Sequence, residues 1–314
     1  MSTVEQLAAL LNTPVGPLRR LVEDAPMLYT SFPVTKKNGK PRIIRPPAPR
    51  LRDVQRCLLD ALQRCVRYPR WMMGGVPKRS IFDHAAPHVG RKMVATFDVK
   101  AFYPSTNSAM VLAVLERLGL RNEAASAVLR LVTKDDELPQ GGPTSGFLAN
   151  LALEPADRRI DALCRKHDLA FTRYVDDMAI SGDADIRSFH GTIVESIESC
   201  GYSVAPDKIR YMGRDVAQLV TKLRVNEKLR PTREFIAEVT KDIRECLTLG
   251  AALVASERGL PIHQLKSSLT GKVAHIRAAD AVIGKKLKGR LYDVNWKAQH
   301  SAALTTETLT TANH

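Results

Sequence analysis

FTRYVDDMAISGD, residues 171–183, has the pattern of a strand, a tight turn and a second strand, with Asp176 and Asp177 at the turn. Two adjacent carboxylates in an apolar hairpin repel each other and lose solvation, so the pair needs a compensating charge. A divalent cation such as Mg²⁺ can supply that charge, because it prefers oxygen ligands. The alternative interpretation is an ordinary solvated turn, a setting in which Asp is common.

A third acid, Asp98, follows the apolar residues 93–97, which have the composition of a strand. If this strand lies beside the hairpin in one sheet, all three carboxylates meet. Two cations roughly 4 Å apart, held by such a cluster, activate a primer hydroxyl and stabilise the pyrophosphate that leaves in an in-line displacement. The three acids are therefore a candidate cation site, beside the more common alternative of a solvated turn.

Other stretches indicate the order of the elements. Residues 4–24 fit two short helices, and residues 51–66, 108–132 and the segment after 146 also have helical periodicity. Strand-like runs flank Asn38-Gly39, which predicts a hairpin with a cationic tip. Beyond Pro231 the pattern is helical to about Trp296. The order is helices, basic hairpin, mixed α/β middle and helical end, which favours one continuous enzyme.

Three motifs carry a resemblance to a known family. They are YVDD at 174–177, FDVKAFYPS at 97–105 and LPQGGPTS at 138–145. In this order and spacing they resemble the Y-x-D-D box, the first-aspartate strand and the P-Q-G loop of the reverse transcriptases, over residues 29–300. Residues 79–88 and 218–226 resemble elements of the bacterial retron type. The chain departs from that type at four positions: His84, Gly146, Val175 and Lys222.

This resemblance implies an α+β fold, the right-hand polymerase of fingers, palm and thumb, with an antiparallel palm sheet and a helical thumb. Residues 1–92 would form N-terminal helices and fingers. Residues 93–229 would form the palm, with fingers helices at about 106–135. Residues 230–300 would form the thumb, and residues 301–314 a disordered tail.

The resemblance also implies roles for individual residues. Asp98, Asp176, Asp177 and the Val99 carbonyl would bind two Mg²⁺ ions, for which Mn²⁺ can substitute. Contacts to the incoming nucleotide would come from five side chains: Lys36 (or Lys37), Arg42, Tyr103, Gln140 and Lys208. Tyr103 would reject a ribose 2′-hydroxyl, and Lys208 would protonate the leaving pyrophosphate. For Tyr103 the alternative is an ordinary core tyrosine. For the hairpin residues Lys36 and Arg42 it is a solvated run of charges.

The charge balance favours a nucleic-acid partner. Lys plus Arg number 47 against 33 Asp plus Glu, a formal net charge of +14, and a basic chain releases counterions when it binds phosphates. A merely basic protein is the alternative. The expected nucleic-acid contacts are Arg79, His88, Lys272, Arg277, Lys285 and Lys288. A metal site at His84 and His88 is disfavoured because Pro87 breaks the helix and no third ligand is near.

The leading hypothesis is a retron-type RNA-directed DNA polymerase. It would use deoxynucleoside triphosphates to make single-stranded DNA (msDNA) from a structured non-coding RNA that is template and primer, in anti-phage defence with a separately encoded effector protein. The alternatives are another bacterial defence-associated or intron-like reverse transcriptase, or a non-catalytic RNA-binding scaffold with a polymerase fold. Five scattered cysteines without a C-x-x-C pair, and no visible signal peptide or membrane span, predict a cytoplasmic protein with no membrane partner.

Overall fold

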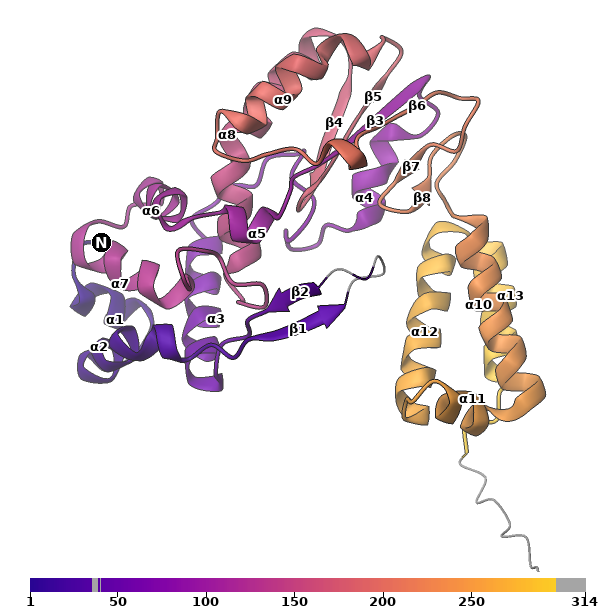
Figure 1. Ribbon diagram of the computed structural model, residues 1–314, viewed down its shortest axis with the longest axis horizontal. Coiled ribbons are helices and arrows are strands. Elements are labelled where there is room, and N and C mark those ends of the chain that lie inside the picture. The colour runs from indigo at the N-terminus through magenta and orange to yellow at the C-terminus, as the bar shows by residue number, and fades with distance from the viewer. Residues whose placement is uncertain (36–38, 40, 298–314) are drawn as a thin grey trace, which may run out of the picture. The chain divides into compact units, whose positions relative to one another are not determined.

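The computed structural model describes residues 1–35, 39 and 41–297, and it divides into two compact units, Met1–Leu229 and Arg230–His314. Figure 1 traces both units along the chain. Each unit has a core of its own, so we describe each separately.

A four-stranded antiparallel sheet is the centre of the first unit. Its order is β4-β5-β3-β6. The strands are β3 (Met93–Asp98), β4 (Ala170–Tyr174), β5 (Asp177–Gly182) and β6 (Arg210–Met212). The predicted strand–turn–strand is therefore present as β4 and β5, and β3 pairs directly with β5, as the sequence led us to expect.

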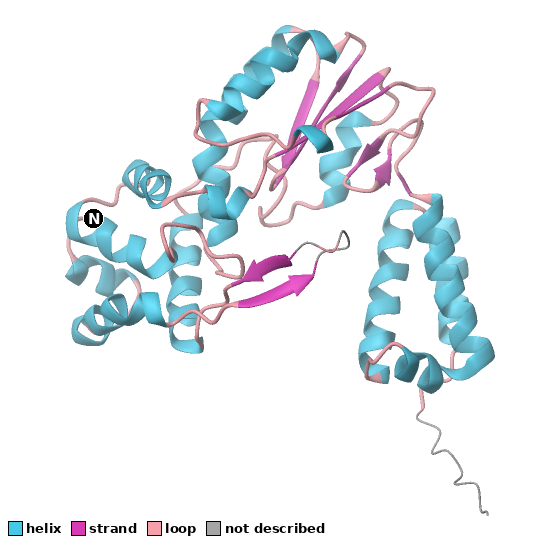
Figure 2. Ribbon diagram, viewed as in Figure 1, coloured by secondary structure: helices cyan, strands magenta, loops and turns pink. Residues whose placement is uncertain are grey.

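Helices cover both faces of this sheet. Successive residues of a strand point to opposite faces, and on β4 the Arg173 side chain bonds to α8 (Ser145–Lys166) while Thr172 bonds to His84 of α4 (Ile81–Ala85). Figure 2 shows the sheet with helices around it. The remaining helical elements of this unit are α1 (Val4–Leu10), α2 (Val15–Asp24), η1 (Ala25–Met27), α3 (Pro49–Gln63), η2 (Ala86–His88), α5 (Phe102–Ser105), α6 (Ser108–Arg117), α7 (Asn122–Val132), η3 (Ile186–Phe189), α9 (His190–Glu198) and η4 (Pro206–Lys208).

The single helical stretch expected over 108–132 is in fact two helices. Gly119 has a φ of +86° directly after the end of α6. Its N–H donates to the Glu116 carbonyl, and the Leu120 N–H donates back to the Leu115 carbonyl, each at 3.0 Å. This pair of bonds is a Schellman cap, which ends a helix and turns the chain. The apolar periodicity continues across the turn because both helices bury one face in the same core.

Two small hairpins complete the first unit. β1 (Phe32–Thr35) and β2 (Pro41–Ile44) pair antiparallel, as predicted around Asn38-Gly39. The tip residues Lys36, Lys37, Asn38 and Lys40 lie outside the described residues. β7 (Leu219–Val220) pairs with β8 (Leu223–Arg224) across a turn at Thr221 and Lys222, both with positive φ.

The second unit begins with the short strand β9 (Arg230–Pro231) and is otherwise helical. It contains α10 (Arg233–Glu245), the π-helical turn η5 (Cys246–Gly250), α11 (Ala251–Glu257), α12 (Ile262–Ala279) and α13 (Ala281–Tyr292). The helices bury an apolar core of their own. Asp280 ends α12 and caps α13 by accepting a hydrogen bond from the Ile283 N–H at 3.0 Å. A Cβ at Gly284 would lie 2.3 Å from the Arg277 Cα, so the two helices meet backbone against backbone there.

Candidate active site

The three acids predicted as metal ligands lie at one end of the sheet. Asp98 ends β3 and is the register partner of Asp177, which begins β5. Asp176 is in the turn between β4 and β5, and its carbonyl accepts a hydrogen bond from the Val99 N–H at 3.1 Å. Register partners in an antiparallel pair have Cα atoms roughly 4.5–5.5 Å apart. The structure therefore brings together acids that are far apart in the chain.

The turn that carries Asp176 and Asp177 has an unusual backbone. Val175 has a φ of +60°, in the left-handed region. That region is costly for a β-branched residue and clusters at functional sites, where the surrounding contacts must hold it. Here the chain changes direction between two paired strands within two residues, which places both acids at the sheet end.

The clustered carboxylates change each other's acidity. Burial, followed by the negative charge of Asp98, raises the pKa of Asp176 above its usual range, and the cations Lys208 and Arg42 offset part of that effect. Burial within the cluster and the charges of Asp176 and Asp98 raise the pKa of Asp177 to about 6. Such mutual repulsion is what a bound cation would relieve.

The donor chemistry of this cluster suits a divalent cation, because three carboxylates provide the oxygen ligands that Mg²⁺ and Mn²⁺ prefer. Within residues 1–35, 39 and 41–297, no three His, Cys, Asp or Glu side chains are grouped as closely as metal ligands. A basic side chain lies beside these acids. The Lys208 Nζ lies 2.6 Å from Asp98 Oδ1, so an ammonium group already neutralises part of the cluster.

Lys208 itself is held as a cation. Partial burial works against its charge, but the hydrogen bond to Asp98 and the charges of all three aspartates raise its pKa. The side chain comes from η4, after the β-bridge of Val99 with Val204 brings this segment against the end of β3. The predicted proton donor therefore lies at the acid cluster.

Two of the residues predicted to contact a nucleotide lie near the cluster, and a third lies in a loop bonded to the basic hairpin. Tyr103 on α5 is half-buried, and burial and the charge of Asp176 raise its pKa. Arg42 on β2 acts electrostatically on both Tyr103 and Asp176. Gln140 lies in the Gly-rich loop, whose backbone carbonyl at Gln140 accepts a hydrogen bond from the Arg45 N–H at 2.7 Å. This bond joins the end of the basic hairpin to the loop.

A buried polar atom of the Gly-rich loop lacks a hydrogen-bond partner. The Gln140 Oε1 atom is buried, and nothing in the described part of the chain donates a hydrogen bond to it. A buried polar atom without a partner is costly, so it marks a place where a ligand can bond. A Cβ at Gly141 would lie 3.2 Å from the Pro46 nitrogen, so the glycine allows the loop to approach the hairpin. Lys36 lies outside the described residues.

The prediction that His88 contacts nucleic acid is wrong for this structure. His88 is fully buried, with Nδ1 2.7 Å from Ser181 Oγ and Nε2 2.7 Å from Thr172 Oγ1. Thr172 Oγ1 is also 2.7 Å from His84 Nδ1, so both histidines belong to a buried polar chain on the sheet face opposite α8. With both ring nitrogens occupied and no exposed surface, His88 has a structural role.

Arg79 also bonds within the fold. Its guanidinium donates to the carbonyls of Pro69 and Met72, and more weakly to Tyr68 at 3.4 Å. These bonds fold the loop between α3 and α4. A contact from Arg79 to RNA remains a prediction.

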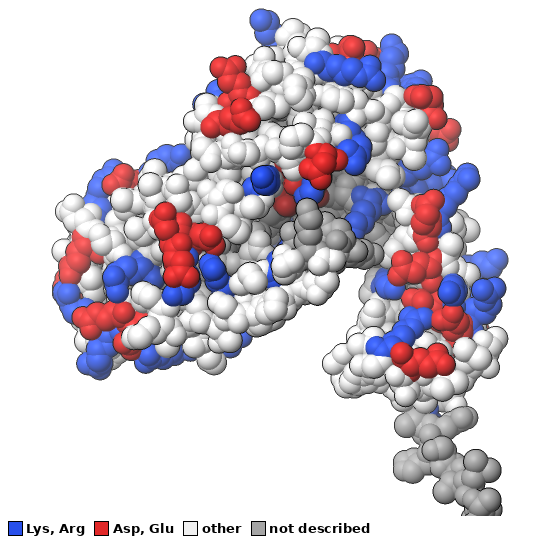
Figure 3. All heavy atoms as spheres, viewed as in Figure 1, with Lys and Arg blue, Asp and Glu red and all other residues white. Residues whose placement is uncertain are grey.

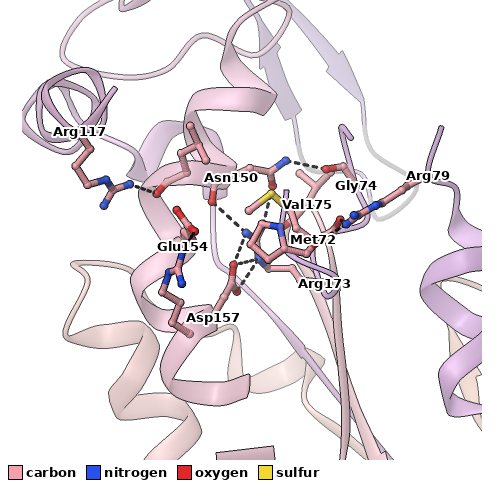
Figure 4. Close-up of polar contacts among 12 residues, drawn as sticks. Met72, Gly74, Arg79, Arg117, Asn150, Glu154, Asp157, Arg173 and Val175 are labelled. Carbon is pink, nitrogen blue, oxygen red and sulfur yellow. Dashed lines mark hydrogen bonds and ion pairs between the residues drawn. The ribbon is translucent and has the colours of Figure 1, made fainter. Parts of the chain in front are cut away.

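Sequence reasoning did not single out Arg173, whose guanidinium is fully buried and paired with Asp157 at 2.6 Å. Figure 4 shows this pair with Asn150 and Val175 around it. A charged residue inside an apolar strand, immediately before the acidic turn, is the signal that was available, because Arg is rarely fully buried without a partner.

The second unit holds the other predicted nucleic-acid contacts. Lys and Arg atoms are spread over the visible face of both units (Figure 3). Arg277, Lys285 and Lys288 line a groove of ≈ 640 Å³, completed by Ala281, Gly289 and Tyr292. The Lys272 Nζ, by contrast, donates to Glu238 at 2.7 Å and Asp242 at 3.1 Å.

Among the helices that the structure describes, none has the length and apolar character of a membrane span.

Comparisons with known proteins agree with this geometry. The sequence profile described as reverse transcriptase (RNA-dependent DNA polymerase) matches residues 34–248. Retron Mx65 reverse transcriptase of Myxococcus xanthus is 31% identical, over 92% of this chain and 71% of that protein. Retron Mx162 reverse transcriptase of the same organism is 27% identical, over 94% of this chain and 67% of that protein.

A solved structure supports the fold. Telomerase from Candida albicans, solved with the TWJ fragment of telomeric RNA, superposes with a TM-score of 0.51 at 12% identity, over 84% of this chain and 58% of that one. The likeness extends to the right-hand α+β polymerase architecture, in which an antiparallel sheet carries the acids. With a profile match over most of its length and a 31% identical relative, the chain belongs to the reverse transcriptase family of RNA-dependent DNA polymerases, in its retron branch.

Proposed function

We propose that this reverse transcriptase copies a structured non-coding RNA, which is both template and primer, into single-stranded DNA joined to that RNA (msDNA). The observation that carries the proposal is the meeting of Asp98 with Asp176 and Asp177 beside Lys208, at the sheet end of a retron-family chain. Within this proposal, residues 1–92 and about 106–135 serve as fingers, residues 93–229 as palm, and residues 230–300 as thumb.

The proposed reaction is one round of nucleotidyl transfer. The primer hydroxyl oxygen forms a bond to the α-phosphorus of a deoxynucleoside triphosphate, the bond from that phosphorus to the pyrophosphate oxygen breaks, and the hydroxyl proton passes to solvent water. Asp98, Asp176 and Asp177, with the Val99 carbonyl, would hold two Mg²⁺ ions, for which Mn²⁺ can substitute. When bound, such ions activate the hydroxyl and stabilise the charge of the leaving group.

The surrounding side chains have separate roles in this proposal. Lys208, a cation at the acid cluster, returns a proton to the leaving pyrophosphate. Arg42, with Lys36, grips the triphosphate, since a guanidinium fork matches phosphate oxygens. The free Gln140 Oε1 contacts the nucleotide. Tyr103, half-buried within reach of the Asp176 charge, lies under the sugar and rejects a 2′-hydroxyl.

The groove of the second unit is the proposed RNA-binding surface. Arg277, Lys285 and Lys288 offer positive charge, and Tyr292 is 89% exposed beside them. Duplex RNA is recognised mainly through its shape, phosphates and 2′-hydroxyls, and unpaired bases stack on exposed aromatic rings. This combination supports a structured RNA with both paired and unpaired segments.

The test is co-expression of the protein with the non-coding RNA encoded beside it, followed by a search for DNA covalently joined to RNA. Asp176→Ala with Asp177→Ala is expected to abolish this product. The matched control is Asp183→Ala, which removes an exposed acid just after β5 and is expected to leave the product unchanged. An undiminished product from the double variant would contradict the assignment of the two acids.

Two alternatives have distinct outcomes in the same experiment. Homopolymeric or template-independent DNA would indicate another kind of bacterial defence reverse transcriptase. Tight RNA binding by the parent protein without any nucleotide incorporation, in Mg²⁺ or Mn²⁺, would indicate a non-catalytic scaffold.

The proposed setting is anti-phage defence, with a separately encoded effector protein as partner. It rests on the retron resemblance. Plaque counts on cells that carry the enzyme, its RNA and the adjacent gene are expected to fall relative to cells that carry the Asp176→Ala, Asp177→Ala variant. Equal plaque counts would contradict this setting while leaving the polymerase proposal intact.

A further inference from the structure

All five N–H groups of the Arg173 guanidinium donate hydrogen bonds inside the core. Nε bonds to both oxygens of Asp157, at 2.8 and 3.0 Å, and Nη2 bonds to Asp157 Oδ2 at 2.6 Å and to the Asn150 carbonyl at 3.1 Å. Nη1 bonds to Asn150 Oδ1 and to the Val175 carbonyl, each at 2.7 Å. Figure 4 shows these bonds converging from α8 and from the turn. A fully satisfied fork of this kind fixes its partners in one geometry.

One of these partners belongs to the acidic turn. The Val175 carbonyl is part of the peptide that leads into Asp176, and Val175 has a left-handed φ of +60°. A backbone in that region costs of order 1–3 kcal/mol and persists only where surrounding contacts impose it. The bond from Arg173 is such a contact, and it acts one residue before the first acid of the pair.

The backbone of Arg173 bonds to the neighbouring segment 71–73. Its N–H donates to the Trp71 carbonyl at 2.8 Å, and its carbonyl accepts from the Met73 N–H at 2.7 Å. The Asn150 side chain then donates to the Gly74 carbonyl at 2.7 Å. A Cβ at Gly74 would lie 2.4 Å from the Val175 nitrogen, so segment 71–74 packs directly against the turn.

Arg173 also contacts the segment that follows the first acid. Its Cζ lies 5.9 Å from the centre of the Phe102 ring, which precedes Tyr103. One buried cation therefore contacts both parts of the chain that supply the acids, the turn at Val175 and the helix after Asp98.

A purely stabilising role does not account for this arrangement. A buried ion pair loses so much solvation that an apolar pair of similar volume is often equally stable or more so. What an apolar pair lacks is the directional bond to a carbonyl. We infer that Arg173, oriented by Asp157 and Asn150, is a positioning residue that fixes the Asp176–Asp177 turn in the geometry needed for cation binding and nucleotide incorporation. This inference rests on the proposed metal site.

The main test replaces the ion pair by an apolar pair of similar size, Arg173→Met with Asp157→Leu. We expect the thermal unfolding midpoint and RNA affinity to stay near those of the parent. The kcat for nucleotide incorporation should fall about 100-fold, the order of loss for a small misplacement of a catalytic group, with KM for the nucleotide little changed. Binding of Mn²⁺ to the protein without nucleotide, followed by electron paramagnetic resonance, should weaken.

A second arginine provides the matched control. Arg117 Nη2 donates to the Leu151 carbonyl of the same helix α8 at 2.5 Å, but within the described residues Arg117 makes no hydrogen bond to the acidic turn. Arg117→Met is expected to keep the parent's kcat and Mn²⁺ affinity. A folded Arg173→Met, Asp157→Leu variant that also keeps both would overturn the inference.

Arg173→Lys decides the question if the double variant does not fold. It retains the positive charge but not the five-bonded fork, so a lowered kcat with an unchanged nucleotide KM supports positioning, and an unchanged kcat overturns it. If the parent protein itself incorporates no nucleotide, the proposed function fails. The Mn²⁺ affinities of parent and variants then still test the positioning role on their own.

Discussion

Gly74 lies directly against the acidic turn, and a side chain there would meet backbone atoms. A Cβ would be 2.4 Å from the Val175 nitrogen and 2.8 Å from the Tyr174 carbonyl carbon. We expect Gly74→Ala to destabilise the fold by about 1–3 kcal/mol, the usual cost of overpacking, and to lower incorporation by displacing the turn. Chemical denaturation and a primer-extension assay measure the two effects.

Gly191 supplies the control for Gly74. It lies in α9, and a Cβ there meets open space. Gly191→Ala is expected to keep activity and to leave stability equal or slightly higher, since Ala favours a helix. Full activity in Gly74→Ala would show that the turn tolerates displacement.

The buried histidines predict a pH dependence of stability. Burial, with the charge of Arg173 on His84 and of His84 on His88, lowers the pKa of both imidazoles to about 3. An unfolded chain binds these protons from about pH 6.5, whereas the folded chain does not. Their contribution to stability is therefore complete above pH 6.5 and is lost as the pH falls towards 3, by up to about 1.4 kcal/mol per pH unit for each imidazole.

The measurement compares thermal unfolding midpoints at pH 7.5 and pH 5. His88→Gln, which can still bond to Ser181 and Thr172, is expected to lose less stability over this interval than the parent. His263→Gln changes an exposed histidine on α12 and should keep the parent's slope. Equal slopes for the parent and His88→Gln would contradict the explanation.

At the scale of elements, the Asp280 side chain caps α13, so we expect its removal to lower the stability of the second unit. Asp280 accepts from the Ile283 N–H at 3.0 Å and so caps α13. Asp280→Ala removes this cap and should destabilise the second unit by about 0.5–2 kcal/mol. Asp280→Asn keeps a capping oxygen and should lose much less, as circular dichroism during urea unfolding would measure. A loss in Asp280→Asn equal to that in Asp280→Ala would show that charge, not capping, matters.

The elements that could be predicted from the sequence are those determined by residues close together in the chain. Alternating apolar residues and the acidic doublet indicated β4, β5 and their turn, and Asn38-Gly39 indicated the β1–β2 hairpin. The division of 108–132 into α6 and α7 was missed because apolar periodicity continues through the Gly119 turn. The left-handed φ of Gly119, which ends α6, is known only from the backbone conformation of the structure.

In the candidate active site, too, some features could be predicted from the sequence and others depend on how the elements pack. The three acids could be predicted because the motifs at 97–105, 138–145 and 174–177 occur together and in order, whereas the acidic doublet alone is common in ordinary turns. The pairing of Arg173 with Asp157, and the burial of His88, depend on how α8 and α4 pack against opposite faces of β4. The periodicity of apolar residues indicates which face of a helix or strand is buried. It does not indicate which polar side chains of two different elements will contact each other.

For the molecule as a whole, the basic groove predicts salt-dependent RNA binding. Lys285→Glu with Lys288→Glu should weaken binding of the structured RNA. The slope of log affinity against log salt should fall by up to about 0.9 for each phosphate that the variant no longer neutralises. Filter binding at several salt concentrations measures this slope. Lys241→Glu, a single charge reversal of the same kind on α10 outside the groove, is the control and should retain the parent's slope.

Incorporation on a short generic primer–template separates the groove from the acid cluster. The Lys285→Glu, Lys288→Glu variant should extend this substrate at a rate near that of the parent at saturating concentration. A lowered saturating rate would contradict a role confined to RNA selection.

The contact at Gly284 has a consequence for substitutions in the groove. Because α12 and α13 touch backbone to backbone there, the glycine sets how closely the two helices approach, whatever side chains stand at Lys285 and Lys288. Leu265, Leu269, Val273 and Ile276 anchor α12 in the unit's core independently of that lining. Lys285 and Lys288 can therefore be replaced without altering that helix contact or the core packing behind it.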